Sequence, residues 1–245
     1  MATAPRKELQ WNTASRVMSN VNNSTTVVVV HGAWADGSSW SGVIRPLQAK
    51  GFKVIAAPIP LTSLSDDVKA LDRVLDRTTG PVVLAAHAYA GAVISATTNA
   101  RVKSLVFIAA LTPAEGETVA DVFYREKPHP MAPQLAPDAA GIIWMPDEGF
   151  GSAFAHKATP EQIALLNATQ RPIAVPCIQE RSPEPSWTHR PSWYLIAEED
   201  RMIPVATQRF LVERMKARVR SEKFDHTPLV TAPDAVVDLI LQAAA

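Results

Sequence analysis

The stretch Pro-Val-Val-Leu-Ala-Ala-His-Ala-Tyr-Ala-Gly, residues 81–91, decides how the rest of the chain is interpreted. It begins with a continuous apolar run at 82–85, which is typical of a strand buried on both faces. A second apolar stretch, at helical spacing, begins at Ala92. The bend between them is lined by small residues: Ala86, Ala88, Ala90 and Gly91. This order predicts a strand, a tight turn and a helix.

The same layout describes the nucleophile elbow, G-x-S-x-G, in which a nucleophile stands on a strained bend between a strand and a helix. The flanking positions must be small because strand and helix approach closely there, and Ala86 and Ala90 meet that need. The central residue, however, is Ala88, and a methyl group has no lone pair with which to attack a carbonyl. The sequence therefore predicts the position of a nucleophile without the nucleophile.

Strand and helix patterns alternate along most of the chain. Strands are expected at 25–31, 53–60, 82–87 and 102–110, with apolar helical faces between them. The pattern resumes after residue 190, with a strand at 193–197, a helix at 205–218, a short strand at 220–225 and a closing helix at 233–244. This alternation predicts an α/β fold with a mostly parallel sheet, helices on both faces, and chemistry at the carboxyl ends of the strands.

The domain organisation follows from where the pattern is interrupted. The core is expected at 25–111 and 191–245, and the proline-rich segment 112–190 between them is interpreted as a helical cap insertion. Short helices are expected within it at 118–125 and 160–170. Residues 1–24 are polar and form an N-terminal arm with no assigned function.

Composition excludes several classes of partner. The 24 Lys and Arg residues balance 24 Asp and Glu residues, so nothing favours nucleic acid or an anionic membrane. The N-terminus lacks the apolar core of a signal peptide, and the longest strictly aliphatic run, Val27–Val30, is too short to span a bilayer. The single cysteine, Cys177, rules out an internal disulfide and suits a reducing compartment. We expect a cytoplasmic protein, and the oligomeric state is not indicated.

Four motifs occur in the order used by a known family. They are His31-Gly32-Ala33-Trp34, the bend at 86–91, the acidic loop Glu199-Asp200-Arg201-Met202-Ile203-Pro204, and Asp225-His226. Together they resemble the oxyanion turn, nucleophile elbow, acid loop and histidine loop of small capped α/β-hydrolases, the group that contains plant-type esterases and hydroxynitrile lyases. The resemblance covers about residues 25 to 243, with the cap as its least specific part.

The resemblance implies a role for each matching residue. His226 would be the base, Asp200 its orienting partner, and Ala88 would occupy the nucleophile position. The backbone N–H groups of Ala33 and Tyr89 would form an oxyanion hole that survives without the nucleophile.

The expected ligand is a small, largely apolar molecule with a carbonyl group. Trp34 beside the oxyanion turn, and Tyr124 and Trp144 in the cap, are the candidate pocket residues. His31 and His87 stand at strand ends and are interpreted as structural. No metal and no cofactor is expected, since the remaining histidines lack metal-ligand spacing: His129, His156 and His189.

Three functions stay open at this point. The first is an ester hydrolase in which Ala88 deliberately replaces the serine. The second is a natural enzyme, lyase- or oxygenase-like and free of cofactor, in which His226 and Asp200 act as a general base. The third is a small-molecule binding protein without turnover. Alanine at 86 and 90 favours a natural variant, and a retained His–Asp pair disfavours the pure binder.

Overall fold

The computed structural model describes residues 24–245, so the predicted arm lies outside the described residues except for Ser24. Within that range the central sheet has six parallel strands in the order β2-β1-β3-β4-β7-β8. The predicted α/β fold is confirmed. The strands are β1 (Thr26–Val30), β2 (Lys53–Ala57), β3 (Val82–His87), β4 (Val102–Ile108), β7 (Ser192–Ala197) and β8 (Arg218–Glu222).

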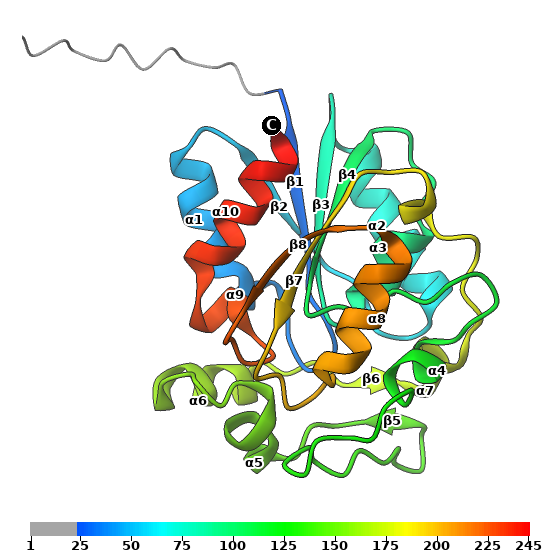
Figure 1. Cartoon of the computed structure of the whole chain (residues 1–245), viewed down its shortest axis with the longest axis vertical. Coiled ribbons are helices and arrows are strands. Elements are labelled where there is room, and N and C mark those ends of the chain that lie inside the picture. Colours follow the sequence, from blue (N-terminus) through cyan, green and yellow to red (C-terminus); the bar gives the residue numbers. More distant parts are fainter. Residues whose placement is uncertain (1–23) are drawn as a thin grey trace, which may run out of the picture.

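Helices cover both faces of this sheet (Figure 1). α1 (Ser41–Ala49) and α10 (Pro233–Ala244) lie on one face, and α2 (Leu64–Asp76), α3 (Ala90–Ala96) and α8 (Val205–Met215) lie on the other. Side chains alternate along a strand, so β1 contributes to both cores. Val27 and Val29 pack on the side of α1 and α10, and Val28 and Val30 pack on the side of α2, α3 and α8. Burial on both faces explains why these strands are continuously apolar.

Near the C-terminus the element boundaries differ from those expected. α8 ends at Met215 rather than at 218, and β8 runs over 218–222 rather than 220–225. Lys216 adopts a left-handed conformation, with φ of +52°, and its N–H bonds back to the last turn of the helix. Glycine is the usual residue at such a helix end, so a lysine gave no stop signal.

Most of the segment 112–190 lies at the end of the sheet where the strands terminate, and its last residues return along the sheet to the start of β7 (Figure 1). The two expected helices are present as α4 (Val119–Phe123) and α6 (Pro160–Ala168), and each begins with a capping box, at Thr118 and Thr159. A two-stranded antiparallel ribbon was not expected: β5 (Ile142–Ile143) pairs with β6 (Ile173–Ala174). The other elements are α5 (Asp147–Gly149), a π-helix η2 (Phe150–Phe154), α7 (Val175–Gln179) and the 3₁₀ helix η3 (Ser186–Thr188).

Two short elements join the strands to the helices of the first face: η1 (Gly37–Trp40) and α9 (Pro228–Thr231). Across residues 24–245, no helix combines the length and the apolar character needed to cross a membrane.

Candidate active site

The turn between β3 and α3 holds Ala88 in a strained conformation. Its φ is +50°, a region that non-glycine residues rarely occupy. The turn is tied down by two backbone bonds, from Ala88 N to Ile108 O (3.2 Å) and from Leu111 N to Ala88 O (3.0 Å). A Cβ on Gly91 would stand 2.5 Å from the Leu111 oxygen, so only glycine fits there. The chain thus presents the residue 88 side chain at the carboxyl end of the sheet.

His226 and Asp200 form a buried pair close to this turn. Nδ1 of His226 lies 2.8 Å from Oδ2 of Asp200, and both residues are almost fully buried. The carboxylate also accepts the N–H groups of Met202 (2.7 Å) and Ile203 (2.9 Å) and the amide of Gln208 (2.9 Å). Because an ionised Asp200 can only accept, it holds the proton of His226 on Nδ1 and leaves the lone pair on Nε2.

His87 supports the loop that carries His226. Its Nε2–H donates to the backbone oxygen of His226 at 2.7 Å, and the two rings lie with centroids 4.7 Å apart. Burial, together with the neighbouring His226, holds the pKa of His87 well below its ordinary value, so this ring stays neutral. This arrangement agrees with a structural role. His31 is also buried, which lowers its pKa, and its Nδ1 lies 3.0 Å from the oxygen of Gly32.

Two backbone N–H groups near the turn are free to bind a ligand oxygen. Within residues 24–245, neither the N–H of Ala33 nor that of Tyr89 donates to a protein acceptor. The two residues are brought together because Gly32 packs against the elbow: a Cβ on Gly32 would lie 3.1 Å from the Cβ of Ala88. Buried backbone N–H groups without a hydrogen-bond partner are uncommon in folded proteins. These two groups are therefore available to an oxygen of a ligand that fills the site.

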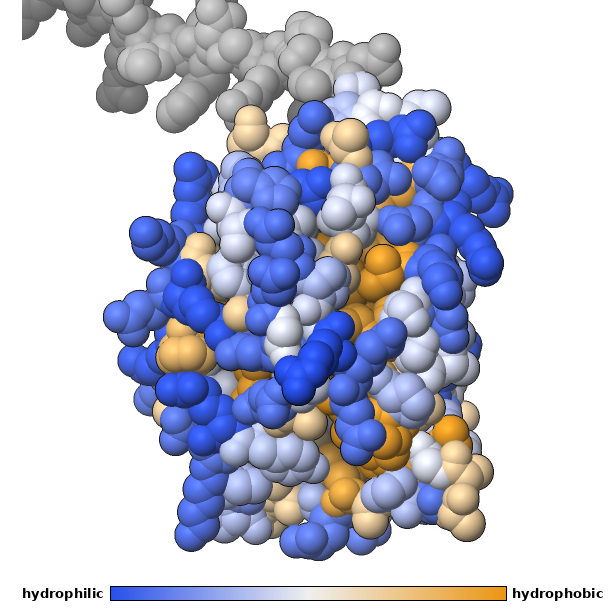
Figure 2. All heavy atoms as spheres, turned by 90° about the vertical axis from the view of Figure 1, so that its right-hand side faces the viewer, coloured by the Kyte–Doolittle hydropathy of each residue, from blue (hydrophilic) through white to orange (hydrophobic). Residues whose placement is uncertain are grey.

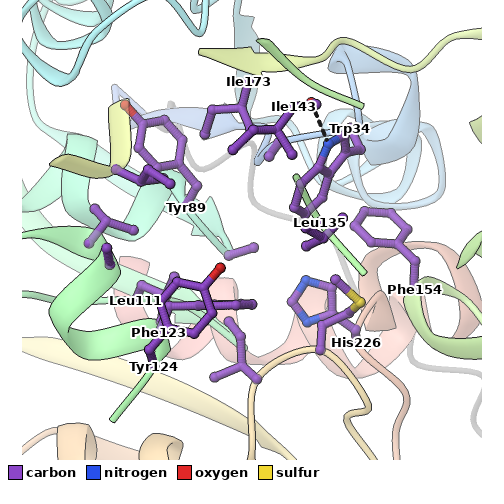
Figure 3. Close-up of a pocket in the computed structure, with 17 residues that line it drawn as sticks. Trp34, Tyr89, Leu111, Phe123, Tyr124, Leu135, Ile143, Phe154, Ile173 and His226 are labelled. Atoms are coloured by element: carbon purple, nitrogen blue, oxygen red, sulfur yellow. Dashed lines mark hydrogen bonds between the residues drawn. The ribbon is translucent and has the colours of Figure 1, made fainter. Parts of the chain in front are cut away.

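Ala33, Ala88, Tyr89 and His226 all line one cavity (Figure 3). The space open to the centre of a water molecule is about 60 Å³. In Figure 3 the rings of Tyr89 and Tyr124 lie on one side of the cavity, and His226 and Phe154 lie on the other. The remaining lining residues are apolar: Trp34, Leu111, Val119, Ala120, Phe123, Leu135, Ile143, Ile173, Ile178, Met202 and Ile203.

Two of the three expected pocket aromatics line this cavity. Trp34 is fixed by a bond from its Nε1 to the oxygen of Ile143 (3.0 Å), drawn as the dashed line in Figure 3. Tyr124 lines the cavity while more than half of its surface stays exposed. Trp144 does not line it and is half exposed. Consecutive residues of an extended segment point to opposite sides, so Ile143 faces the cavity and Trp144 faces away.

The sequence interpretation missed a buried polar cluster behind Tyr89. Asp67 of α2 is fully buried and accepts the hydroxyl of Tyr89 (2.7 Å) and the N–H of Leu61 (2.7 Å). The thiol of Cys177 lies 3.7 Å from the same carboxyl. Burial raises the pKa of Asp67 to about 6, and burial beside this carboxyl raises the pKa of Cys177 to about 12. Asp67 lies four residues before Leu71 on the apolar face of α2, and a charged residue at that position is the signal that could have found it.

The described residues, 24–245, contain no group of three or more His, Cys, Asp or Glu side chains arranged to hold a metal ion.

Comparison with known proteins gives the family. The alpha/beta hydrolase family matches residues 27–239. The chain is 23% identical, over 249 residues, to a pyrethroid hydrolase of Sphingobium wenxiniae (strain DSM 21828 / CGMCC 1.7748 / JZ-1), covering 90% of this chain and 88% of that protein. It is 22% identical, over 246 residues, to the alpha/beta hydrolase nvfD of Aspergillus novofumigatus (strain IBT 16806), covering 89% of this chain and 96% of that protein.

Solved structures show the same fold. The chain superposes on polyneuridine aldehyde esterase with a TM-score of 0.78 at 18% identity, covering 90% of this chain and all of that one. It superposes on a pyrethroid hydrolase from Sphingobium faniae JZ-2 with a TM-score of 0.77 at 20% identity, covering 90% and 97%. The resemblance found in the four sequence motifs is therefore confirmed, and this chain belongs to the alpha/beta hydrolase family.

Proposed function

We propose that the chain has the architecture of a carboxylic-ester hydrolase in which Ala88 occupies the nucleophile position. In this proposal His226 is the general base, Asp200 orients it, and the N–H groups of Ala33 and Tyr89 bind the carbonyl oxygen of a small substrate. One observation carries the proposal: the buried His226–Asp200 pair, 2.8 Å apart, opens onto the same apolar cavity as Ala88.

The alanine limits the chemistry of the chain as it stands. No acyl-enzyme can form on a methyl group, and loss of the serine from a triad lowers turnover on the order of 10⁶-fold. The remaining route is direct: Nε2 of His226 takes a proton from water, the water oxygen attacks the carbonyl carbon, and the oxyanion is held by the two N–H groups. The protonated imidazole then returns the proton to the leaving alcohol as the ester bond breaks.

A second candidate function uses the same base differently. Without a nucleophile, His226 can abstract an acidic proton from a bound carbonyl compound, which is lyase-like or oxygenase-like chemistry. It is favoured by the free N–H groups of Ala33 and Tyr89, because an enolate oxygen needs the same two donors. A pure binding protein is disfavoured because it has no use for a buried base held by a carboxylate.

We further propose that segment 112–190 acts as a cap that excludes water from the reacting groups. Phe123, Ile143, Phe154 and Ile173 all come from this segment and all line the cavity. Phe154 contacts the ring of His226 edge-on, with centroids 5.3 Å apart. We retain the cytoplasm as the proposed location, on the basis of the one buried thiol.

The test is turnover of short aryl esters by four proteins: the unchanged chain, Ala88→Ser, and each of these combined with His226→Ala. The ester-hydrolase architecture is supported if Ala88→Ser hydrolyses esters, if adding His226→Ala abolishes that activity, and if the unchanged chain is inactive. A parent that hydrolyses esters and needs His226 supports direct attack by water. If all four proteins are folded but do not hydrolyse esters, the ester-hydrolase proposal is wrong. The second candidate function is then tested with carbonyl compounds that carry an acidic proton.

A further inference from the structure

Few polar side chains face the cavity beside Ala88. Among the described residues that line it, those whose side chains carry a nitrogen or an oxygen are Trp34, Tyr89, Tyr124 and His226. Two of these side chains are already bonded within the protein, because the indole N–H of Trp34 donates to a backbone oxygen and the Tyr89 hydroxyl donates to Asp67. The base His226 and the hydroxyl of Tyr124 therefore remain for a ligand.

The hydroxyl of Tyr124 has no hydrogen-bond partner in the part of the chain that the structure describes. The other two tyrosines differ from it. The hydroxyl of Tyr89 lies 2.7 Å from the Asp67 carboxyl, and that of Tyr194 lies 2.6 Å from a backbone oxygen. In Figure 3 the hydroxyl of Tyr124 points toward the middle of the cavity, while that of Tyr89 points away from it. Tyr124 thus offers an O–H donor that a ligand can use.

Tyr124 directly follows α4, and its neighbours hold it in place. Phe123 lines the cavity as well, and the two rings meet edge-on with centroids 4.9 Å apart. The N–H of Tyr124 donates to the oxygen of Ala120 (3.0 Å) at the end of the helix. On the other side, the guanidinium of Arg125 lies 3.6 Å from the ring centre of Phe210 in α8. Packing therefore limits where the hydroxyl can lie before any ligand binds.

Tyr124 lies between the cavity and solvent, since more than half of its surface is exposed although it lines the cavity. The face that lies to the right in Figure 1, where α4 is found, is turned toward the viewer in Figure 2, and hydrophobic residues show between hydrophilic ones in its lower half. In Figure 3 Tyr124 lies across the cavity from His226. A ligand that lies between these two side chains meets one hydrogen-bonding group at each end.

We propose, building on the ester-hydrolase function above, that Tyr124 determines substrate specificity by donating a hydrogen bond to a second oxygen of the substrate, apart from the reacting ester group. The preferred substrates are small esters that also carry a ketone or another acceptor, rather than purely apolar esters. The physical reason is that an acceptor placed against the apolar side chains of this cavity loses its bonds to water, and Tyr124 replaces one of them. One neutral hydrogen bond of this kind changes affinity by roughly fivefold.

The experiment compares Tyr124→Phe with the tyrosine in the Ala88→Ser background, using pairs of esters in which isopropyl replaces acetyl. Ethyl 3-oxobutanoate is paired with ethyl 3-methylbutanoate, and the three acetylphenyl acetates are paired with the three isopropylphenyl acetates. The first pair carries the acceptor on the acid and the others carry it on the alcohol, so neither part of the ester is favoured in advance. The quantity measured for each ester is kcat/KM with tyrosine divided by kcat/KM with Tyr124→Phe, which cancels the intrinsic reactivity of the ester.

This ratio should be about fivefold, and at least threefold, for one or more of the ketone esters and below twofold for the matching isopropyl ester. Trp144→Phe is the matched control, because Trp144 is an exposed aromatic residue of the same segment that does not line the cavity, and it should change kcat/KM less than twofold for every ester. The proposal is overturned if the ratio stays below threefold for every ketone ester, or if the isopropyl esters respond as strongly.

Equilibrium binding separates this proposal from the proposed function. The unchanged chain has no nucleophile at residue 88, so calorimetry can record its binding of the same esters with and without Tyr124→Phe. Suppose that Ala88→Ser hydrolyses none of them, but that Tyr124→Phe weakens binding of a ketone ester at least threefold and of its isopropyl partner less than twofold. The ester-hydrolase proposal is then wrong and the contact from Tyr124 stands. If the esters bind without this difference, the assignment of Tyr124 is wrong, and if they are neither hydrolysed nor bound, both proposals are wrong.

Discussion

Replacing Asp67 by Asn should change how the stability of the protein depends on pH. Asp67 is buried with no cation beside it, and burial raises its pKa from 3.8 to about 6 in the folded state. A raised folded pKa means that the folded state holds the proton more tightly than the unfolded chain. The resulting stability is fully present below pH 3.8 and is lost as the pH rises through about 6.

The size of the effect follows from the shift. A shift of about two pKa units means that the parent loses roughly 3 kcal/mol of stability as the pH rises from below the unfolded pKa to above the folded pKa. About 2 kcal/mol of this loss falls between pH 4.5 and pH 8. The other titrating groups around Asp67 do not compete in this window: burial raises the pKa of Tyr89 well above 10 and that of Cys177 to about 12. The exposed Asp66 has a pKa lowered by its bond to Ser63.

The assay is urea unfolding of the parent and Asp67→Asn at pH 4.5 and pH 8. The quantity compared is the unfolding free energy of Asp67→Asn minus that of the parent. This difference should be about 2 kcal/mol more positive at pH 8 than at pH 4.5. All other titratable groups are common to both proteins, so their contributions cancel in the difference. Asp66→Asn is the control on the same helix: the pKa of Asp66 is lowered from 3.8, so its contribution to stability is already complete at pH 4.5 and the Asp66→Asn difference should stay nearly constant up to pH 8. An Asp67→Asn difference that also stays constant between these two pH values would refute the reasoning.

Three further predictions concern packing and the dyad. Gly91→Ala should lower the unfolding free energy by about 2 kcal/mol or more in thermal or urea unfolding, because the added Cβ would lie 2.5 Å from the Leu111 oxygen. An unchanged unfolding midpoint would contradict this close approach. Phe154→Ala should cost about 3–5 kcal/mol in the same assay, since it empties a fully buried position beside the imidazole, and a cost below 1 kcal/mol would contradict that packing. Asp200→Asn in the Ala88→Ser background should lower kcat on the order of 10⁴-fold with the fold intact by circular dichroism; near-normal kcat would show that the carboxylate does not orient the base.

The sheet could be predicted because each central strand has to be apolar on both faces. The runs at 26–30, 82–87 and 102–108 satisfy that need and alternate with amphipathic helices, which leaves few other topologies. The order of the strands then brings the bend at Ala88, the loop at Asp200 and the loop at His226 to one end of the sheet. The resemblance to the motifs of small capped α/β-hydrolases then singled out Asp200 and His226, which the structure shows 2.8 Å apart.

The features that were missed depend on contacts between distant segments. The two short strands of the β5–β6 ribbon are each two residues long, and no periodicity can be read from so few positions. Asp67 looks like a surface residue until Tyr89, 22 positions away, donates a hydrogen bond to it. Trp144 was expected in the pocket from its residue type, but its neighbour Ile143 takes the inward position. Residue type indicates a site, and backbone direction decides which side chain enters it.

The central claim is that the base, its carboxylate and the two N–H donors are assembled around an elbow that lacks only its nucleophile. Labelling with a fluorophosphonate, followed by intact mass and peptide mapping, tests this claim most directly. Ala88→Ser should be phosphonylated at residue 88 in stoichiometric amounts, whereas the parent and the double variant with His226→Ala should not react. A folded Ala88→Ser protein that stays unlabelled, or one that is labelled equally well without His226, would contradict the account.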